Sequence, residues 1–504
     1  MNRFKGHTIR TLAIATAILM ATALSGGCGG SSGGGGGGGT EPGIDRLGVK
    51  AGTVTGFGSI FVNGVEFETD SASFEVDDDS TGSSQDDLNI GDTVIVTFDP
   101  DVAANVAQTV FSDDAVEGPI DSIDGVGSTL VVAGQTVTVD ASTSFDDSIA
   151  TGSLAGLAVD DIVEVSGFFD ANGGIRATRI EPKLPGGEVE VKGFVEGLDT
   201  NAMTFSINAL NVDYTNAVID DSFPNMTFAN GDFVEVKGLN FGAGGELLAT
   251  KIEPDGPGVA DDGTFDNFDE VEIEIEGLIT RFASATDFDV SGFPVTTTGS
   301  TVFEGGAAGD LGVNVKVEVD GDLNASGVLV ATKVDIRRSN NLRVTALVDS
   351  VDAPAGTLVM LGITVAVDDD TRREDKSDAE LEPFGLENVA AGNYVEVRGG
   401  VDPSGNADIL ASLLEREDVP DDPTGETELR GFVDAGSIAQ PSFRISGVTV
   451  ETNGGTVFRD LLGMVVSAND FFNALQDGDA VDVNGTETAQ TTITAEEVEM
   501  ELEN

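Results

Sequence analysis

Beyond residue 28, this chain lacks the histidine and cysteine residues on which much of protein catalysis depends. His7 is the only histidine and Cys28 the only cysteine among 504 residues. Beyond residue 7 there is thus no Ser–His or Cys–His pair for nucleophilic catalysis, and no imidazole for zinc, copper or iron. The glycines of 33–39 are not followed by Lys-Ser or Lys-Thr, so they do not predict a phosphate-binding loop. We therefore expect a protein that is not an enzyme and has no catalytic or cofactor-binding residues.

Carboxylates are the one reactive group present in quantity, 89 against 25 lysines and arginines. Two facing acids can hydrolyse a glycosidic bond, but no pair stands out, so a carboxylate-based polysaccharide-active enzyme is the weakest hypothesis. Calcium, a hard ion that prefers several oxygen ligands, is the only cofactor that the composition suggests. The run Asp320, Asp322 and Asn324 begins like a D-x-D-x-N calcium loop, although Ala325 and Ala331 replace the Gly and Glu of an EF-hand.

Other acidic runs offer the same oxygen chemistry: Asp77–Asp79, Asp368–Asp370, and Asp261 and Asp262 with Asp266 and Asp269. A hairpin turn is the competing interpretation of these loops. The segments 170–173 and 402–406, which occupy the same place as Asn324 in a repeated pattern, combine Asp, Asn and Gly as tight turns do. Both interpretations, turn and weak calcium site, stay open at this stage.

The charge of the chain excludes some partners. The formal net charge is −64, and without residues 1–27 the chain has 22 basic and 89 acidic residues, a charge of −67. Such a charge repels the phosphates of nucleic acids and the surface of anionic lipids. We expect no nucleic-acid partner and instead a polysaccharide or protein surface as ligand.

The N-terminal residues predict a targeting segment. Arg3, Lys5 and Arg10 precede an apolar run from Thr11 to Leu24, which is too short to cross a bilayer as a helix and has the length of a signal-peptide core. Three small residues, 25–27, separate this run from Cys28. The pattern predicts a signal peptide over 1–27.

The setting of Cys28 resembles the lipobox of bacterial lipoproteins, with Leu24 one place further from the cysteine than is usual. The resemblance implies cleavage before Cys28, acylation of its thiol by chains such as palmitate, and a membrane anchor. Gly29, where an inner-membrane protein of this class carries Asp, implies the outer membrane and hence the cell envelope. The Gly/Ser-rich segment 28–46 then predicts a flexible tether with a reach of roughly 25 Å.

From residue 47 onward four features recur in one order. A strand with a central glycine opens each copy, a V-D-x-x-T element follows, then a V-E-V-x-G strand, and an A-T-basic-aliphatic strand closes it. The third feature is the clearest and recurs at 163–167, 234–238, 317–321, 395–399 and 481–485. The period of about 70 to 85 residues suits a whole small domain. We expect six repeats, the first divergent, at 47–115, 116–184, 188–255, 270–338, 342–416 and 427–502.

Within each repeat, short runs of alternating apolar and polar residues predict antiparallel strands. In V-E-V the valines are expected to face the core and the glutamate to face water. The fold class is therefore all-β, a tandem array of small barrels with an OB-like form as one option. Helices are expected only as short pieces, near 379–388 and 460–476.

Tandem copies with G-D-x-V-E-V-x-G and a closing A-T-x-I strand resemble a bacterial domain of unknown function (DUF5666) that is common in predicted lipoproteins. The resemblance covers about residues 50 to 502 and implies a small β-barrel but no activity. Our leading hypothesis is thus an envelope-anchored structural or binding lipoprotein that presents repeated β-domains. A calcium-binding acidic surface protein is the second hypothesis.

Overall fold

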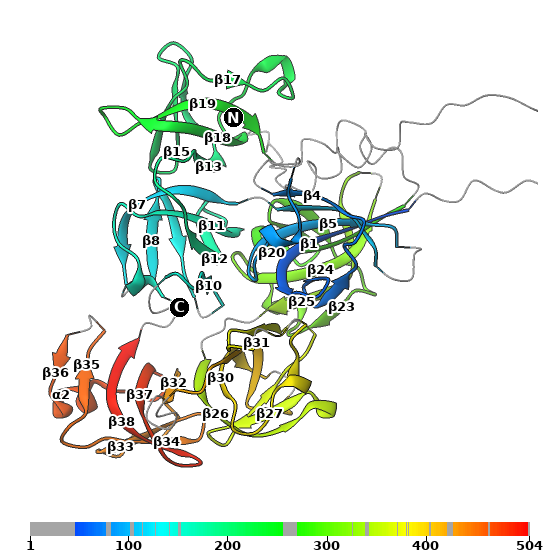
Figure 1. Ribbon diagram of the computed structural model, residues 1–504. Coiled ribbons are helices and arrows are strands. Elements are labelled where there is room, and N and C mark those ends of the chain that lie inside the picture. Colours follow the sequence, from blue (N-terminus) through cyan, green and yellow to red (C-terminus); the bar gives the residue numbers. More distant parts are fainter. Residues whose placement is uncertain are drawn as a thin grey trace, which may run out of the picture.

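The computed structural model describes residues 46–501 with short gaps, and it is built almost wholly of strands (Figure 1). The gaps lie at 77–81, 101–104, 113, 126–127, 141, 150–152, 256–269, 325, 338–341, 370, 380, 382, 403–404, 421–426 and 462–463. The described strands group into six units that follow the six repeats in chain order. The all-β prediction is therefore confirmed.

Repeats 1 and 4 contribute their strands to one sheet. Repeat 1 contains β1 (Arg46–Gly56), β2 (Ile60–Val62), β3 (Val65–Phe67), β4 (Ser73–Val76), the 3₁₀ turn η1 (Gln85–Asp87), β5 (Thr93–Phe98) and β6 (Ala107–Ser112). Repeat 4 contains β20 (Glu270–Ser284), β21 (Asp287–Val290), β22 (Phe293–Thr296), β23 (Val302–Glu304), η7 (Ala308–Asp310), β24 (Lys316–Leu323) and β25 (Leu329–Arg337).

Repeats 2 and 3 form the second sheet. Repeat 2 contains β7 (Val116–Asp124), β8 (Thr129–Val132), β9 (Gln135–Thr138), β10 (Ser144–Phe145), η3 (Leu154–Gly156), β11 (Ile162–Phe169) and β12 (Ile175–Pro182). Repeat 3 contains β13 (Val189–Phe194), β14 (Glu196–Asp199), β15 (Thr204–Ile207), β16 (Leu210–Asp213), β17 (Val218–Ile219), η4 (Pro224–Met226), β18 (Phe233–Phe241) and β19 (Leu247–Pro254).

Repeats 5 and 6 form the third sheet. Repeat 5 contains β26 (Leu342–Asp352), η8 (Ala353–Ala355), β27 (Thr357–Met360), β28 (Ile363–Ala366), β29 (Arg372–Asp375), η9 (Leu386–Asn388), β30 (Tyr394–Val401) and β31 (Ile409–Glu417). Repeat 6 contains β32 (Thr427–Phe432), β33 (Ser442–Ile445), β34 (Val448–Glu451), β35 (Val457–Arg459), β36 (Val465–Val466), the helix α2 (Ala468–Ala474), β37 (Ala480–Ala489) and β38 (Thr492–Glu501). The helix and η9 fall within the two segments where short helical pieces were expected.

Every repeat has the same five-stranded ring, which repeat 2 illustrates. The opening strand β7 pairs with β8 and with β11, β8 forms a hairpin with β9, and the closing strand β12 joins β9 to β11. All these pairs are antiparallel except β9–β12, which is parallel. This order of strands is that of the OB barrel, a Greek-key barrel of five strands. The predicted antiparallel barrel therefore needs one parallel pair to close.

The ring closes in slightly different ways in the six copies. In repeats 2, 4 and 5 continuous ladders complete it. In repeats 1 and 6 an isolated bridge completes it, Glu68 to Val106 and Val433 to Ile445 respectively. In repeat 3 the opening strand is interrupted at Val195 and continues as β14, which pairs with β15. Repeat 1 thus has the same barrel despite its divergent sequence.

The glycine of V-E-V-x-G marks a bulge at which the central strand of the ring comes very close to the closing strand. The register shifts immediately before Gly167, Gly238, Gly321, Gly399 and Gly485. A Cβ on Gly321 would lie 2.2 Å from the carbonyl oxygen of Val330, so no larger residue fits without backbone movement. In repeat 1 the bulge remains, with Phe98 at this position.

The prediction for the glutamate of V-E-V is wrong. The valines point into the barrel as expected, but Glu164, Glu235, Glu318 and Glu396 are themselves buried. Each lies on the outer face of its barrel under a basic side chain, for example Glu164 with Lys183 and Glu318 with Arg337. A carboxylate removed from water needs such a partner. Two arginines, Arg343 and Arg398, lower the pKa of Glu396 to about 2 despite its burial.

The V-D-x-x-T element is a turn that ties two strands together. In repeat 2, Thr143 is fully buried and its hydroxyl donates to the carbonyl of Ala177 on the closing strand, at 2.9 Å. In repeat 5, Thr371 makes the equivalent bond to Ala411 at 2.9 Å. The aspartate of the element bonds locally, as in the bond from the N–H of Ser142 to Asp140, whereas the threonine bonds the distant closing strand.

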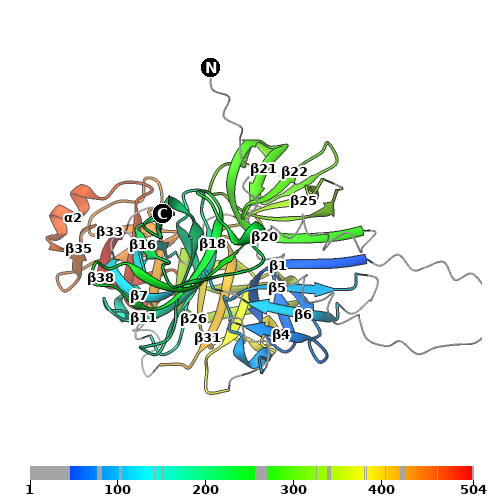
Figure 2. The same cartoon turned by 90° about the horizontal axis from the view of Figure 1, so that it is seen from above.

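Barrels join in pairs through their opening strands. The first half of each opening strand has one edge inside its own ring and one edge outside it. The outer edges pair β7 with β13 and β26 with β32 in antiparallel fashion, and β1 with β20 in parallel over six residues. Figure 2 shows β1 and β20 side by side, although paired residues such as Arg46 and Glu270 lie far apart in the chain. Repeat 1 therefore pairs with repeat 4 and not with its neighbour in sequence.

The apolar core follows these pairs. One buried cluster is continuous through repeats 2 and 3, and another through repeats 5 and 6. Leu47, Val49 and Ala51 of β1 belong to the same cluster as the interior of repeat 4. The interior of repeat 1 itself is a separate cluster around Val54, Ile60 and Phe67. A barrel of this size buries a modest core on its own, so repeats 2 and 3, and repeats 5 and 6, each form a larger domain.

Repeats 1, 2, 4 and 5 meet at a centre that we call the hub. Arg179 of repeat 2 lies 3.5 Å from Asp92 of repeat 1, and Lys376 of repeat 5 lies 2.9 Å from Asp147 of repeat 2. The backbone N–H of Ala171 in repeat 2 donates to Asn314 in repeat 4 at 3.0 Å. Strands β1 and β29 also lie in contact there. Repeats 3 and 6 extend outward from the hub (Figure 1).

We predict that Gly321→Ala destabilises the protein by about 2 kcal/mol, because the added methyl group overpacks the bulge. Thermal and urea unfolding would measure this as a lower midpoint. The control is Gly299→Ala in the same repeat, where a Cβ meets nothing within 4 Å and the backbone is ordinary. That control should change stability by less than about 0.5 kcal/mol. Equal effects of the two substitutions would contradict the role of the bulge.

Candidate cation site

Carboxylates stand directly opposite one another along β20 and β24. The cross-strand pairs are Glu272 with Asp322, Glu274 with Asp320, and Glu276 with Glu318. Like charges in this arrangement destabilise a sheet unless cations compensate them. The ladder lies where repeat 4 meets repeat 1, since Lys50 of β1 is the parallel partner of Glu274.

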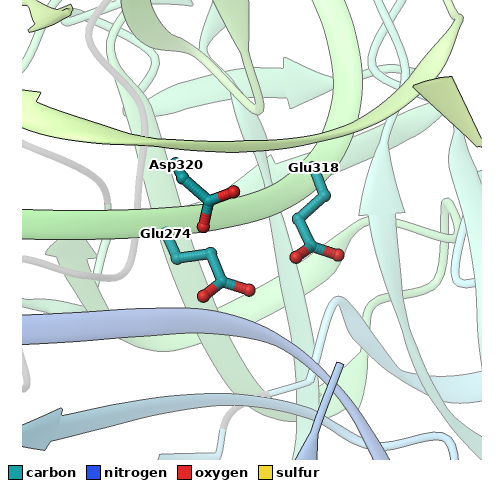
Figure 3. Close-up of side chains that lie close together, drawn as sticks. All are labelled: Glu274, Glu318 and Asp320. Atoms are coloured by element: carbon teal, nitrogen blue, oxygen red, sulfur yellow. The ribbon is translucent and has the colours of Figure 1, made fainter. Parts of the chain in front are cut away.

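Three of these acids converge. Carboxylate oxygens of Glu274, Glu318 and Asp320 all lie within 4.8 Å of one another. Figure 3 shows the three side chains turned toward a common space, Glu274 from β20 and the other two from β24. Hard oxygen ligands gathered in this way are what calcium or magnesium prefers.

Basic side chains already compensate much of this charge. The ammonium group of Lys50, whose side chain is almost wholly buried, is in contact with Glu274. Arg337 bonds Glu318 at 2.5 Å, and Lys333 lies 3.7 Å from Asp320. A divalent cation that binds here would therefore join or displace the ammonium of Lys50.

Asp320 is the acid that these cations satisfy least. Burial and the neighbouring charge of Glu318 raise its pKa, while Lys333 and Lys50 oppose the shift. Beside it lies a cavity of about 280 Å³ that reaches from β1 to β24 and is lined by Glu272, Glu274, Asp320 and Asp322 among others. An added cation would lower the pKa of Asp320.

The three residues predicted as calcium ligands do not act together. Asp320 belongs to the cluster and Asp322 lines the adjoining cavity, both on strand β24. Asn324 instead closes the following hairpin, where its side-chain oxygen accepts from the N–H groups of Ser326 and Val328. The turn interpretation therefore holds for Asn324.

Sequence reasoning missed Glu274 and Glu318. Their signal is the alternation E-I-E-I-E at 272–276 facing V-E-V-D at 317–320, which puts acids on one face of two strands. Only the register of the ladder brings them together. Among the other candidates, Asp368 accepts from Thr371 at 3.0 Å in a turn, and Asp402 likewise accepts from Asn406 and Ala407. Cys28, Asp77–Asp79, Asp370 and the acids at 261–269 lie outside the described residues.

Fold and repeats together define a tandem array of OB-type barrels. A comparison with known families also finds tandem repeats. A model of the family described as Domain of unknown function (DUF5666) matches residues 117–181, 189–253, 276–335, 345–415 and 430–499. The chain belongs to this family. Repeat 1 is not among the matched segments, but it has the strand order of the other five.

The other comparisons add little. No curated protein matches the chain. Among solved structures, drosophila Unr CSD456 is similar at 16% sequence identity, over 45% of this chain and 98% of that one. The TM-score of 0.12 is too low for this likeness to support an argument.

Proposed function

We propose that the protein is a structural or binding lipoprotein of the cell envelope that presents its six barrels to a polysaccharide or protein surface. The observation that carries this proposal is the joining of barrels through their opening strands, which makes a large multi-barrel body out of small domains. A body of this kind offers an extended surface for contact. Nothing in this role requires catalysis, and we propose that the protein is not an enzyme.

The anchor is the second part of the proposal. The lipobox-like setting of Cys28 and the glycine-rich segment after it support acylation and attachment, with the outer membrane favoured by Gly29. Two or more acyl chains are enough for stable attachment, since each buried CH₂ contributes about 0.8 kcal/mol. Among the residues that the structure describes, no helix has the length and apolar character needed to cross a membrane.

The negative charge of the chain favours a partner that is not itself polyanionic. OB-type barrels of other proteins include nucleic-acid binders, but a formal charge of −67 opposes the phosphates of DNA and RNA. A surface that is not polyanionic, such as a neutral polysaccharide or a protein, meets no such repulsion.

Cys28→Ser should abolish incorporation of labelled palmitate and move the protein from the membrane fraction to the soluble fraction. The thiol is the only acylation site of this type that the chain offers. Radiolabelling followed by membrane fractionation measures both effects. Ser31→Ala, three residues away, is the matched control and should leave label and location unchanged. Palmitate label on the Cys28→Ser variant would refute the anchor.

The mature chain should bind at least one neutral surface polysaccharide or envelope protein and should not bind single-stranded DNA at physiological salt. A glycan array, together with a pull-down from envelope extracts, would measure the former. Fluorescence anisotropy with labelled DNA would measure the latter. Absence of any polymer or protein ligand would contradict a binding role and leave only the structural one.

Calcium binding at the junction of β20 and β24 is the second candidate function, favoured by the convergence of Glu274, Glu318 and Asp320. The carboxylate oxygens of this cluster would coordinate the calcium ion, whose positive charge would offset the repulsion between the facing acids. Because Lys50 holds one of these carboxylates, the expected affinity is weak. In this role ions would rigidify the junction between repeats 1 and 4.

Calcium at millimolar concentration should raise the melting temperature by a few degrees relative to chelator, since ligands that bind only the folded state stabilise it. Asp320→Asn should remove this increment, whereas Asn324→Ser, in the adjacent turn, should keep it. Differential scanning calorimetry measures both. An unchanged melting temperature of the unsubstituted protein would exclude calcium from this function.

A further inference from the structure

A second cavity, of about 300 Å³, lies in the hub and is lined by side chains from four repeats. Repeat 1 contributes Asn63, repeat 2 Thr178, repeat 4 Glu276 and Lys316, and repeat 5 Arg372. Its size is at the lower end of the range for small-molecule sites. It shares Glu318 with the acidic cluster but is otherwise lined by other residues, and it forms only when repeats 1, 2, 4 and 5 are assembled.

Asn63 places an unpartnered amide group at this cavity. Its side chain is 6% exposed, its oxygen accepts from the N–H of Thr53 at 3.0 Å, and its nitrogen Nδ2 has no protein partner. The asparagine at the same hairpin position of repeat 3, Asn208, bonds Gln135 at 2.7 Å and the carbonyl of Gly173 at 2.9 Å. The free donor of Asn63 is therefore not a general property of the hairpin.

Thr178 likewise lacks a hydrogen bond that the equivalent residues of other repeats make. In repeats 3, 4 and 5 the hydroxyl that lies across the bulge donates to the carbonyl before the bulge glycine, at 3.0 to 3.2 Å: Thr250 to Lys237, Thr332 to Asp320 and Ser412 to Arg398. Thr178 occupies this position in repeat 2 and is 5% exposed, yet its hydroxyl makes no hydrogen bond. A buried polar atom without a partner costs free energy, so this hydroxyl would gain from a hydrogen bond to a ligand.

Arg372 brings a positive charge to the cavity. It is 5% exposed and bonds only neutral oxygens, the hydroxyl of Ser144 at 2.9 Å and the carbonyl of Ser142. None of the described carboxylates forms an ion pair with it. Burial and the nearby charge of Arg398 lower its pKa to about 10. Asp140, Glu276 and Glu374 oppose this shift through their charge without forming an ion pair with Arg372. A buried guanidinium without an ion pair favours an anionic partner.

The acids around the cavity are already engaged. Lys316 bonds Glu276 at 2.7 Å, Arg337 bonds both Glu318 and Asp335, Lys333 lies 3.5 Å from Glu304, and Thr371 bonds Asp368. What remains is one amide donor and one hydroxyl without a partner, and one guanidinium that bonds only neutral oxygens. Each of these three groups can donate a hydrogen bond, so a ligand needs acceptor oxygens. The oxygen that meets the guanidinium should carry a negative charge.

We propose that the hub cavity binds a small hydroxylated carboxylate of the size of one sugar acid. The carboxylate pairs with Arg372, and hydroxyl oxygens meet Asn63 and Thr178. This site goes beyond the proposed function, because it depends on the assembly of the repeats and not on the anchor or on a polymer surface. Its ligand in turn holds the four repeats together.

The test is isothermal titration calorimetry of the purified mature chain with glucuronate, galacturonate and gluconate, and with glucose as the uncharged comparison. At least one acid should bind, and glucose should bind at least tenfold more weakly. If the cavity holds only water, none of the three acids binds, and the proposal is overturned. Failure of palmitate labelling would affect the anchor alone.

Thr178→Val tests the contact without risk to the fold, because the lost hydroxyl makes no bond in the protein. It should weaken binding roughly two- to tenfold and leave the melting temperature equal or higher. Thr250→Val is the matched control, since it loses a real hydrogen bond in repeat 3 and should leave binding intact. Arg372→Gln should weaken binding roughly ten- to a hundredfold. Equal affinities of Thr178→Val and the unsubstituted protein would refute the site.

Discussion

The outer edge of each opening strand is the constraint on which this architecture depends. Within a five-stranded ring, the backbone N–H and C=O groups in the first half of that strand are paired on one side only. An unpaired strand edge promotes uncontrolled association. Every repeat meets the requirement with the opening strand of another repeat, in the pairs β7–β13, β26–β32 and β1–β20. Three double barrels result, and the hub forms where two repeats of one pair meet single repeats of the other two.

The scarcity of basic residues is a second constraint on this assembly, because few cations are present to pair with buried carboxylates. Residues 28–504 include 89 acids and 22 bases, and most lysines and arginines that the structure describes cover buried carboxylates or join repeats. Lys50, Arg179 and Lys376 each link two repeats. These three positive charges thus lie at junctions between repeats, where they meet carboxylates. Arg372 differs from these three, since it bonds only neutral oxygens and lines the hub cavity.

Much of the fold and little of the site could be predicted. Alternation in V-E-V, the repeated glycine and the A-T strand are local signals, and each corresponds to a strand or a bulge. The burial of Glu164 and Glu318 could not be predicted, because it depends on Lys183 and Arg337 covering them from the neighbouring closing strand. Asp320 was predicted from its D-x-D-x-N-like run, but Glu274 joins it only through the register of β20 and β24.

The sequence by itself determined the six copies, the barrel within each copy, the charge, and the absence of histidine and free thiol chemistry after residue 28. These are matters of local periodicity and composition. Tertiary structure decided which copies pair, that repeat 1 joins repeat 4, and which polar groups meet at the hub. The physical reason is that strand edges and buried charges are satisfied by partners from other strands, in the case of β1 and β20 from the far part of the chain, and no local pattern records which partner is chosen.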